Sequence, residues 1–270
     1  MRYTRPYTII FSTATLDARI ASSTGYSMLS CIYDFTRLYY LRGIVDAVMV
    51  GANTILIDNP TLRKRLQPQS KRYYRIIIDG KLRVKPGLRI FTEKSDSRVV
   101  IITAIDDQSR ITDFKKKVPS DLVDIHIVGR NGVIDLRKAF SLLQEIYGIE
   151  SILVEGGGHL NYKLIESKLV DEIRVTITPY IFGAGISFIR DPEERGFASA
   201  EEGPRLDLIC FEKCPCGRCI HLVYRIAGSS KEHIPQVNIP ACLSDRLVEI
   251  NRYAKTPYSS KQSKYRHKNG

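Results

Sequence analysis

Ser151-Ile-Leu-Val-Glu-Gly-Gly-Gly-His-Leu160 is an apolar run that stops at a carboxylate and three consecutive glycines. The run from Ile152 to Val154 is too short for a helix and predicts a buried strand. Three glycines let the backbone turn sharply and approach a ligand with no Cβ in the way. Residues 159–168 then carry leucine and isoleucine at helical spacing. We therefore expect a strand, a glycine turn and a helix start in immediate succession.

The junction between this strand and this helix is typical of an anion site, because free backbone N–H groups and the positive end of the helix dipole meet there. Glu155 would lie in the crevice outside the carboxyl end of a parallel strand, where ligands bind in open α/β sheets. The alternative is a glycine-rich connection with an incidental glutamate. The stretch by itself leaves both interpretations open.

Composition limits the kind of protein. With 270 residues and 43% hydrophobic content, the chain can bury one substantial core, so we expect one main domain. No run approaches the length of a membrane span, and the apolar start at Tyr7–Phe11 is soon followed by Asp17 and Arg19, which predicts a cytoplasmic protein with no membrane partner. A net charge of +12 fits nucleotides, phosphorylated metabolites or nucleic acid as partners, without choosing among them.

Apolar runs and helical stripes alternate along most of the chain. Strands are predicted at residues 7–14, 46–51, 74–79, 98–103, 122–128 and 172–181, with a closing antiparallel pair at 206–211 and 219–226. Helices are predicted at 31–42 and at 136–147, where Asp135 can cap the start and Gly148 the end. Unbroken apolar strands separated by helices predict an α/β fold, with a mostly parallel central sheet and helices on both faces.

From residue 228 the character changes. The last 43 residues hold eight Lys or Arg against three Asp or Glu, and one apolar stripe, from Leu243 to Ile250. We expect a main domain over 1–227 and a basic, largely disordered extension over 228–270 with one short helix. A solvated tail is favoured over a nucleic-acid-binding arm.

A second candidate ligand-binding segment, residues 50–65, lies at the end of a predicted strand. Thr54 and Asp58 are four residues apart, so a helical turn would put both on one side. Pro60 breaks that turn, and Arg63 and Arg65 follow in a loop where they could grip a phosphate. Ordinary turn chemistry would explain these residues equally well.

Five motifs occur in one order along the chain: Asp17-Ala-Arg-Ile-Ala21, Leu41-Arg-Gly-Ile-Val-Asp-Ala-Val-Met-Val-Gly51 with Thr54, Asp58 and Pro60, Val154-Glu-Gly-Gly-Gly158, Leu169-Val-Asp-Glu172 and Pro179-Tyr-Ile-Phe-Gly-Ala-Gly185. Together they resemble the riboflavin-biosynthesis pyrimidine reductase family, whose fold is similar to dihydrofolate reductase, over roughly residues 6–226. The resemblance implies an NADPH-dependent reduction of 2,5-diamino-6-ribosylamino-4(3H)-pyrimidinone 5′-phosphate, or of its deaminated relative, to the ribitylamino product. It also implies a homodimer that pairs through sheet edges.

The resemblance assigns roles to particular residues. Those expected to bind the cofactor are Thr54, Asp58, Gly156, Gly157, Gly158, His159 and Leu160. Those expected to bind the phosphorylated pyrimidine are Ser27, Arg42, Leu62, Arg65 and Glu155. Among them Glu155 is the expected catalytic residue, which could hydrogen-bond the pyrimidine amino groups or assist ring opening, and the arginines suit the 5′-phosphate. For Arg42 the alternative is a surface charge at a helix end.

The chain departs from the family pattern at two places. Ala18-Arg19 replaces a Gly-Lys pair, and Leu29 replaces an aromatic residue that could stack on the nicotinamide. Lys81 and Arg83, after the strand at 74–79, are candidates for a cofactor 2′-phosphate, or else exposed loop charges.

Four cysteines, Cys210, Cys214, Cys216 and Cys219, fall within ten residues. Thiolates this dense could hold zinc or form disulfides. Because the spacing is not that of two CxxC knuckles, we expect no metal and favour reduced thiols in a hairpin loop. Residues 215–219 also mimic half of a zinc deaminase signature, but no His-x-Glu occurs in the sequence. This argues for a stand-alone reductase acting on the still-aminated substrate.

Two other functions remain open. A different reductase of the same fold would share the cofactor half of the site. A non-catalytic nucleotide- or RNA-binding protein would owe its affinity to the basic extension, and removing residues 228–270 would then abolish salt-dependent binding. We regard nucleic acid as the less favoured partner.

Overall fold

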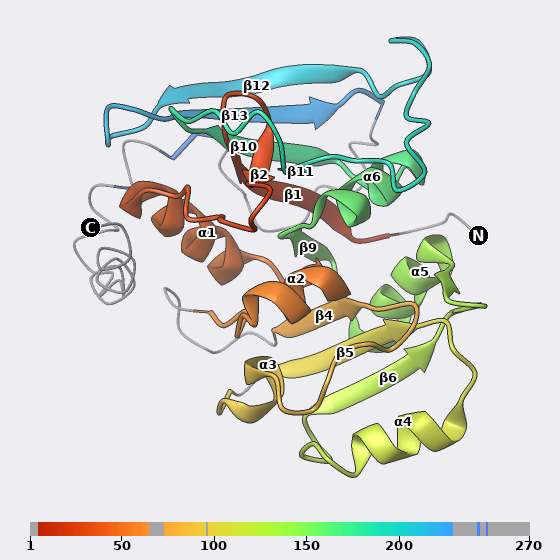
Figure 1. The fold of residues 1–270 in the computed structure, drawn as a ribbon. Helices are drawn as coiled ribbons and strands as arrows, with labels where there is room; N and C mark the ends of the chain where they lie inside the picture. The colour runs from red at the N-terminus through yellow and green to blue at the C-terminus, as the bar shows by residue number, and fades with distance from the viewer. Residues whose placement is uncertain (1–4, 65–72, 96, 229–241, 244–246, 248–270) are drawn as a thin grey trace.

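The computed structural model describes residues 5–64, 73–95, 97–228, 242–243 and 247. Its main sheet contains β1 (Tyr7–Ala14), β3 (Ala47–Gly51), β4 (Tyr74–Ile78), β5 (Arg98–Thr103), β6 (Val123–Ile127), β9 (Ser151–Val154), β10 (Glu172–Ile177), β12 (Leu206–Lys213) and β13 (Ile220–Ile226). The spatial order is β12-β13-β10-β1-β9-β3-β4-β5-β6 (Figure 1). From β10 to β6 every neighbouring pair is parallel, whereas β13 runs antiparallel to both β10 and β12.

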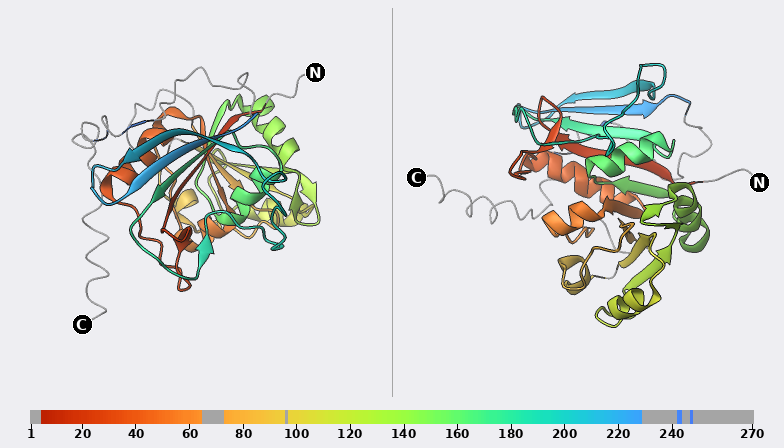
Figure 2. Two further views of the ribbon diagram at one scale, coloured as in Figure 1. Left: turned by 90° about the horizontal axis from the view of Figure 1, so that it is seen from above. Right: turned by 45° about the vertical axis from the view of Figure 1, so that its right-hand side comes forward.

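Helices cover both faces of this sheet. They are α1 (Ile32–Ile44), α2 (Ala52–Asp58), α3 (Arg89–Thr92), α4 (Gln108–Lys115), α5 (Leu136–Tyr147) and α6 (Gly158–Glu166). Helices α1 to α4 contribute to one apolar core and α5 and α6 to the other, on opposite faces of the sheet (Figure 2). The strands serve both cores by alternation: Val48 and Val50 of β3 enter the first, and Met49 enters the second.

These observations confirm the predicted α/β fold with its mostly parallel sheet and closing antiparallel pair. The capping prediction for α5 is also confirmed, since the backbone N–H of Lys138 donates to the Asp135 carboxylate at 3.1 Å and Gly148 ends the helix with a φ of 62°. The strand predicted to reach residue 181 ends earlier, at Ile177. Pro179, which has no backbone N–H, follows closely and cannot donate to a strand ladder.

Several short elements were not predicted. They are α3, α4 and two small antiparallel pairs, β2 (Arg19–Ala21) with β11 (Ile186–Ser187) and β7 (Gly129–Arg130) with β8 (Val133–Ile134). Each is too short, or in the case of α4 too polar, to give a clear hydrophobic period.

Helix α1 lies on an unusually polar part of the sheet. Its Asp34 carboxylate accepts hydrogen bonds from Thr13 of β1 at 2.6 Å and from Thr176 of β10 at 2.5 Å. Its Arg37, fully buried, forms an ion pair with Glu212 of β12 at 3.1 Å. Directional bonds therefore fix the position of this helix across three strands, in addition to apolar packing.

Most of residues 228–270 lies outside the described residues, including most of the helix predicted after Leu243. The described part includes a disulfide between Cys210 of β12 and Cys242. Leu243 and Leu247 are buried, and the backbone N–H of Leu243 donates to the Glu212 carboxylate at 3.0 Å. Among the described residues, no helix has the length and apolar character to cross a membrane.

Candidate active site

The carboxyl ends of β1, β9 and β3 lie side by side, because β9 is inserted between the other two strands. Beyond the end of β9, the backbone is bonded to β3. The N–H of Glu155 donates to the Met49 carbonyl at 2.9 Å, and the N–H of Gly51 donates to the Gly156 carbonyl at 3.0 Å. The peptide bond between Gly156 and Gly157 is cis. These bonds set the point at which the Glu155 side chain leaves the sheet.

Glu155 forms a two-pronged ion pair with Arg42 from the last turn of α1. Arg42 Nε donates to Oε1 at 2.6 Å and its Nη2 donates to Oε2 at 2.5 Å. The two side chains are only 11% and 10% exposed. Burial by itself lowers the pKa of Arg42, but the charge and hydrogen bonds of Glu155 raise that pKa above its usual value. Arg42 is therefore a buried partner of Glu155 and not a surface charge.

The described part of the loop after α2 contacts Arg42. Arg42 Nη1 donates to the carbonyl of Arg63 at 3.3 Å, and the preceding residue, Leu62, is buried. The Tyr73 hydroxyl donates to the Leu62 carbonyl at 3.2 Å, and burial raises the pKa of this tyrosine. Three of the residues predicted to bind substrate, at positions 42, 62 and 155, are thus brought together.

The other two predicted substrate residues are placed differently. Ser27 is exposed in the segment before α1, where its carbonyl accepts a hydrogen bond from the N–H of Leu29 at 2.9 Å. Leu29 itself is buried. Arg65 lies outside the described residues.

The glycine turn presents bare backbone between α2 and α6. A Cβ added to Gly156 would meet nothing within 4 Å, and one added to Gly157 would meet only the Thr54 hydroxyl, at 3.6 Å. Gly157 caps α6, whose first-turn N–H groups have no partner inside the helix. The glycines therefore leave room for an anion at a helix start, in reach of the Thr54 hydroxyl.

The remaining predicted cofactor residues flank this turn. Thr54 is half-buried and Asp58 exposed, and both belong to α2, so the predicted helical turn is confirmed. His159 is exposed at the first turn of α6. Leu160 is buried in the second apolar core, close to Gly51, so it offers a ligand its backbone N–H and not its side chain.

Asp17 joins two of the sequence motifs. The Asp17 carboxylate accepts hydrogen bonds from the Thr15 hydroxyl at 2.6 Å, the Phe182 N–H at 3.1 Å and the Gly183 N–H at 2.8 Å. The Thr15 bond is the main reason that the pKa of Asp17 falls to about 2, and the two N–H donors contribute further. Asp17 thus fastens the segment after β1 to the segment after β10.

An open pocket lies beside this junction, at Gly183. It is lined by Arg19, Gly183, Ala184, Gly185, Ser187, Arg190, Asp191, Glu194, Arg195 and Gly196. Arg19, which replaces the family's lysine, donates to the Ser187 hydroxyl at 2.5 Å. This pocket was not predicted from the sequence, although the glycines at 183 and 185 and the arginines at 190 and 195 gave a signal for it.

Arg83 lies beside the start of α2. Its Nη1 donates to the Asn53 side chain at 2.9 Å, while the loop is held by a bond from the Arg83 N–H to the Asp79 carboxylate at 2.5 Å. Lys81 is exposed in the same turn. Both cations are at the carboxyl end of β4, on the same edge of the sheet as the glycine turn.

The cysteine prediction needs one correction. Cys210 does not belong to the thiol group of the hairpin, because it lies within β12 and forms a disulfide with Cys242. Cys214, Cys216 and Cys219, in the turn between β12 and β13, are free thiols as predicted. Cys31, which the sequence did not connect with them, lies 3.6 Å from Cys214, sulfur to sulfur.

Comparison with known proteins identifies the family. The profile of the RibD C-terminal domain matches residues 6–220. The chain belongs to the RibD C-terminal domain family. A Methanothermobacter thermautotrophicus protein named 2,5-diamino-6-ribosylamino-4(3H)-pyrimidinone 5′-phosphate reductase is 33% identical over 181 residues, which cover 66% of this chain and 80% of that protein. The riboflavin biosynthesis protein RibD of Actinobacillus pleuropneumoniae is 32% identical over 180 residues, but only 46% of its length is covered.

Solved structures agree on the fold. The Thermotoga maritima deaminase/reductase superposes with a TM-score of 0.66 at 24% identity, over 83% of this chain and 57% of that one. The Saccharomyces cerevisiae riboflavin biosynthesis reductase Rib7 gives a TM-score of 0.60 at 23% identity, over 83% and 90%. The predicted resemblance and the dihydrofolate-reductase-like fold are confirmed. The chain covers about half the length of the Actinobacillus pleuropneumoniae and Thermotoga maritima proteins and most of the length of the Methanothermobacter thermautotrophicus and Saccharomyces cerevisiae proteins.

The glycine turn can be tested by a matched pair of substitutions. A Cβ on Gly158 would lie 2.2 Å from the backbone carbonyl oxygen of Ser187, whereas the nearest atom to a Cβ on Gly157 is at 3.6 Å. We expect Gly158→Ala to destabilise the protein by about 1–3 kcal/mol through overpacking, although alanine favours helices. Gly157→Ala is the control and should unfold near the wild-type urea midpoint. Equal midpoints for both variants would contradict the packing described for α6.

The three hydrogen bonds that the Asp17 carboxylate accepts, called here the Asp17 clasp, predict a specific pH dependence of stability. Because the pKa of Asp17 in the folded protein is lowered to about 2, its stabilising effect is present above the unfolded pKa of 3.8 and is lost as pH falls toward 2. NMR titration of the Asp17 carboxyl should give a midpoint near 2. Thr15→Val, which removes the first donor, should move the midpoint upward. An Asp17 midpoint at the ordinary value in the wild type would show that the clasp does not form.

Proposed function

We propose that this chain is an NADPH-dependent reductase of riboflavin biosynthesis, which converts the ribosylamino side chain of 2,5-diamino-6-ribosylamino-4(3H)-pyrimidinone 5′-phosphate to the ribitylamino form. Relatives of the family carry that name in archaea, bacteria and yeast. The observation that carries the proposal is the buried pair of Arg42 and Glu155 directly beside a glycine turn at a helix start. In the reaction the sugar opens to an imine, whose first sugar carbon accepts a hydride and whose nitrogen is left as an amine after protonation.

NADPH supplies the hydride when it is bound, and the glycine turn fits its pyrophosphate. The open space at Gly156 and Gly157 admits an anion, and the first-turn N–H groups of residues 158 to 160 can donate to it. Thr54 and Asp58 of α2 would contact the cofactor from the other side. Lys81 and Arg83 supply positive charge at the same sheet edge, which suits a 2′-phosphate.

Glu155 is well placed to contact the pyrimidine. Each of its carboxylate oxygens accepts one hydrogen bond from Arg42 and keeps further capacity to accept. Those positions could accept hydrogen bonds from amino groups of the substrate, which favours the aminated pyrimidine. Arg42 holds the Glu155 carboxylate in place with its Nε and Nη2 groups, so these donors are not available to a phosphate. We therefore assign Arg42 to positioning Glu155 and assign the 5′-phosphate to Arg65. Ser27 and Leu62 would complete the substrate site.

The protein supplies orientation and charge, since the hydride comes from the cofactor. The bidentate contact fixes the carboxylate plane, so a substrate held by Glu155 would be held in one orientation. We also propose that the enzyme acts in the cytoplasm.

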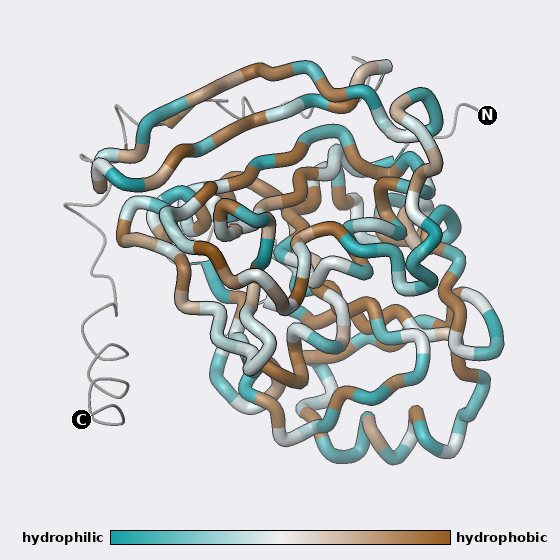
Figure 3. The backbone as a smooth tube through the Cα atoms, turned by 45° about the horizontal axis from the view of Figure 1, so that its top comes forward, coloured by the Kyte–Doolittle hydropathy of each residue, from teal (hydrophilic) through white to brown (hydrophobic). Residues whose placement is uncertain are grey.

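We also propose that two copies pair through the edge strand β12. Five large apolar residues of β12 and β13 are exposed by between 38% and 63%: Leu206, Leu208, Ile209, Phe211 and Ile220. Figure 3 shows long apolar stretches along this outer hairpin. An edge strand with this much apolar surface is a ready template for pairing with another chain.

The proposed activity is tested by following NADPH oxidation with the diamino ribosylamino pyrimidinone phosphate as substrate. We expect turnover by the wild type, and a loss of about 100-fold or more in kcat/KM for Glu155→Gln, which keeps the size of the side chain but removes its charge. Glu145→Gln, at an exposed position on α5, is the matched control and should be as active as the wild type.

The outcomes separate the alternatives. NADPH binding without turnover of this substrate would indicate another reductase of the same fold. A folded protein that binds no NADPH would overturn the reductase proposal, and salt-dependent RNA binding would then favour the binding protein. Turnover of the deaminated substrate alone would overturn the substrate assignment.

The dimer is tested with Phe211→Asp, since Phe211 is the most exposed of the five apolar residues at 63%. A charge there should convert a dimer to a monomer in sedimentation equilibrium, because a buried, unpaired charge opposes association. Ile146→Asp is a control, since Ile146 is a 60% exposed apolar residue on α5. A monomeric wild type would refute the pairing.

A further inference from the structure

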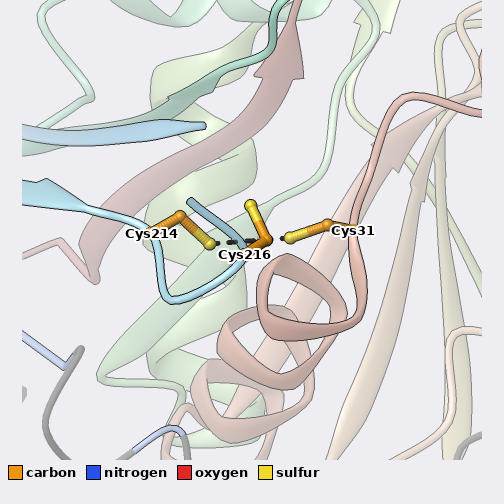
Figure 4. A group of neighbouring side chains, drawn as sticks. All are labelled: Cys31, Cys214 and Cys216. Carbon is orange, nitrogen blue, oxygen red and sulfur yellow. Dashed lines mark hydrogen bonds between the residues drawn. The ribbon is translucent and has the colours of Figure 1, made fainter. Parts of the chain in front are cut away.

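Four free thiols gather where the turn between β12 and β13 meets the start of α1. Three come from the turn, Cys214, Cys216 and Cys219, and the fourth is Cys31, immediately before the first residue of α1. The sulfurs of Cys31, Cys214 and Cys216 all lie within 4.8 Å of one another. Figure 4 shows the three side chains converging from the two segments.

The spacing of these sulfurs suits a tetrahedral metal ion. A Zn–S bond of about 2.3 Å gives about 3.8 Å between two sulfurs of one tetrahedron. The distance between Cys31 and Cys214 is 3.6 Å. A disulfide would require two sulfurs in covalent contact and would leave the third thiol without a role, whereas a metal ion uses all three. The geometry therefore favours a shared ion over a bonded pair.

Polar groups of α1 and of the turn surround the sulfurs. The backbone N–H of Asp34 donates to Cys31, and the backbone N–H of Cys216 and the Arg37 side chain donate to Cys214. Such donors orient ligating sulfurs. The positive charge of Arg37 also offsets part of the negative charge that several thiolates would bring to this buried place.

The turn itself is built to present two sulfurs on one side. The N–H of Gly217 donates to the Cys214 carbonyl at 2.8 Å, and the N–H of Cys214 donates to the Cys219 carbonyl at 2.9 Å. Gly217 has a φ of 78°, which a residue with a side chain rarely adopts. Cys219 is buried, and its thiol hydrogen-bonds to that of Cys216, so it is the candidate for the fourth ligand.

We infer that Cys31, Cys214, Cys216 and Cys219 form a structural zinc site that clips the start of α1 to the β12–β13 turn. Sulfur ligands select zinc over magnesium and calcium, and a complete set of four leaves no open position for catalysis. The site is at the opposite end of α1 from Arg42, a helix of 13 residues or about 20 Å. It is thus separate from the proposed reductase site and does not depend on the proposed activity.

The inference is tested on the full-length protein purified in reducing buffer. Mass spectrometry of the metal content should find about one zinc per chain. After zinc removal, added Co²⁺ should give the visible and near-ultraviolet absorption of a tetrahedral cobalt–thiolate centre. Cys31→Ser and Cys216→Ser should each weaken Co²⁺ binding by at least about tenfold. Cys242→Ser, which breaks the disulfide to Cys210 and leaves the four thiols intact, is the control and should keep its zinc.

Two results would overturn the inference. One is a folded, reduced wild-type protein, checked by circular dichroism, that holds no zinc and gives no cobalt–thiolate absorption. The other is a non-reducing peptide map that links Cys31 to Cys214 in folded, metal-free protein, which would identify the pair as a disulfide. The wild-type cobalt titration decides the matter even where a cysteine variant fails to fold.

Discussion

The ion pair between Arg42 and Glu155 joins the last turn of α1 to the carboxyl end of β9, and the geometry of the site depends on it. Because both side chains are about nine-tenths buried, losing either one would leave a charge without compensation, at a cost of about 3–5 kcal/mol. The two side chains therefore stay in contact. Arg42 also holds the loop that contains Leu62, through its hydrogen bond to the Arg63 carbonyl. A carboxylate held this firmly is oriented before any ligand arrives.

The same helix is fastened along its whole length by directional bonds. Asp34 bonds to two strands and Arg37 bonds to a third. The cluster of free cysteines lies at the start of the helix. A helix held only by apolar contacts can slide or rotate at little cost, whereas hydrogen bonds and ion pairs fix one register. Burying the polar groups under α1 costs desolvation free energy. Their bonds in return hold Arg42 in a single position.

Features that depend on residues close together in the chain could be predicted from the sequence. The apolar strands, the caps of α5 and the strand–glycine–helix order are local patterns, and all were recovered. Partners far apart in the chain were not: Cys31 and Cys214 are 183 positions apart, and Arg42 and Glu155 are 113 apart. The family motifs named Arg42 as a site residue, but no pattern stated that its partner is Glu155, because the pairing arises only when α1 crosses the end of β9. Short polar elements such as α4 were not predicted, because their sequences show no clear hydrophobic period.

The bond between Cys210 and Cys242 has a consequence for the covalent continuity of the chain. It closes a loop of 32 positions, so that a single proteolytic cut between residues 228 and 242 would produce two peptides that stay joined through sulfur. The C-terminal peptide would separate only on reduction, and on a gel the nick would be invisible until then. The segment beyond residue 242 is therefore anchored to the sheet edge in two ways, by the main chain and by a bond whose persistence follows the redox state of its surroundings.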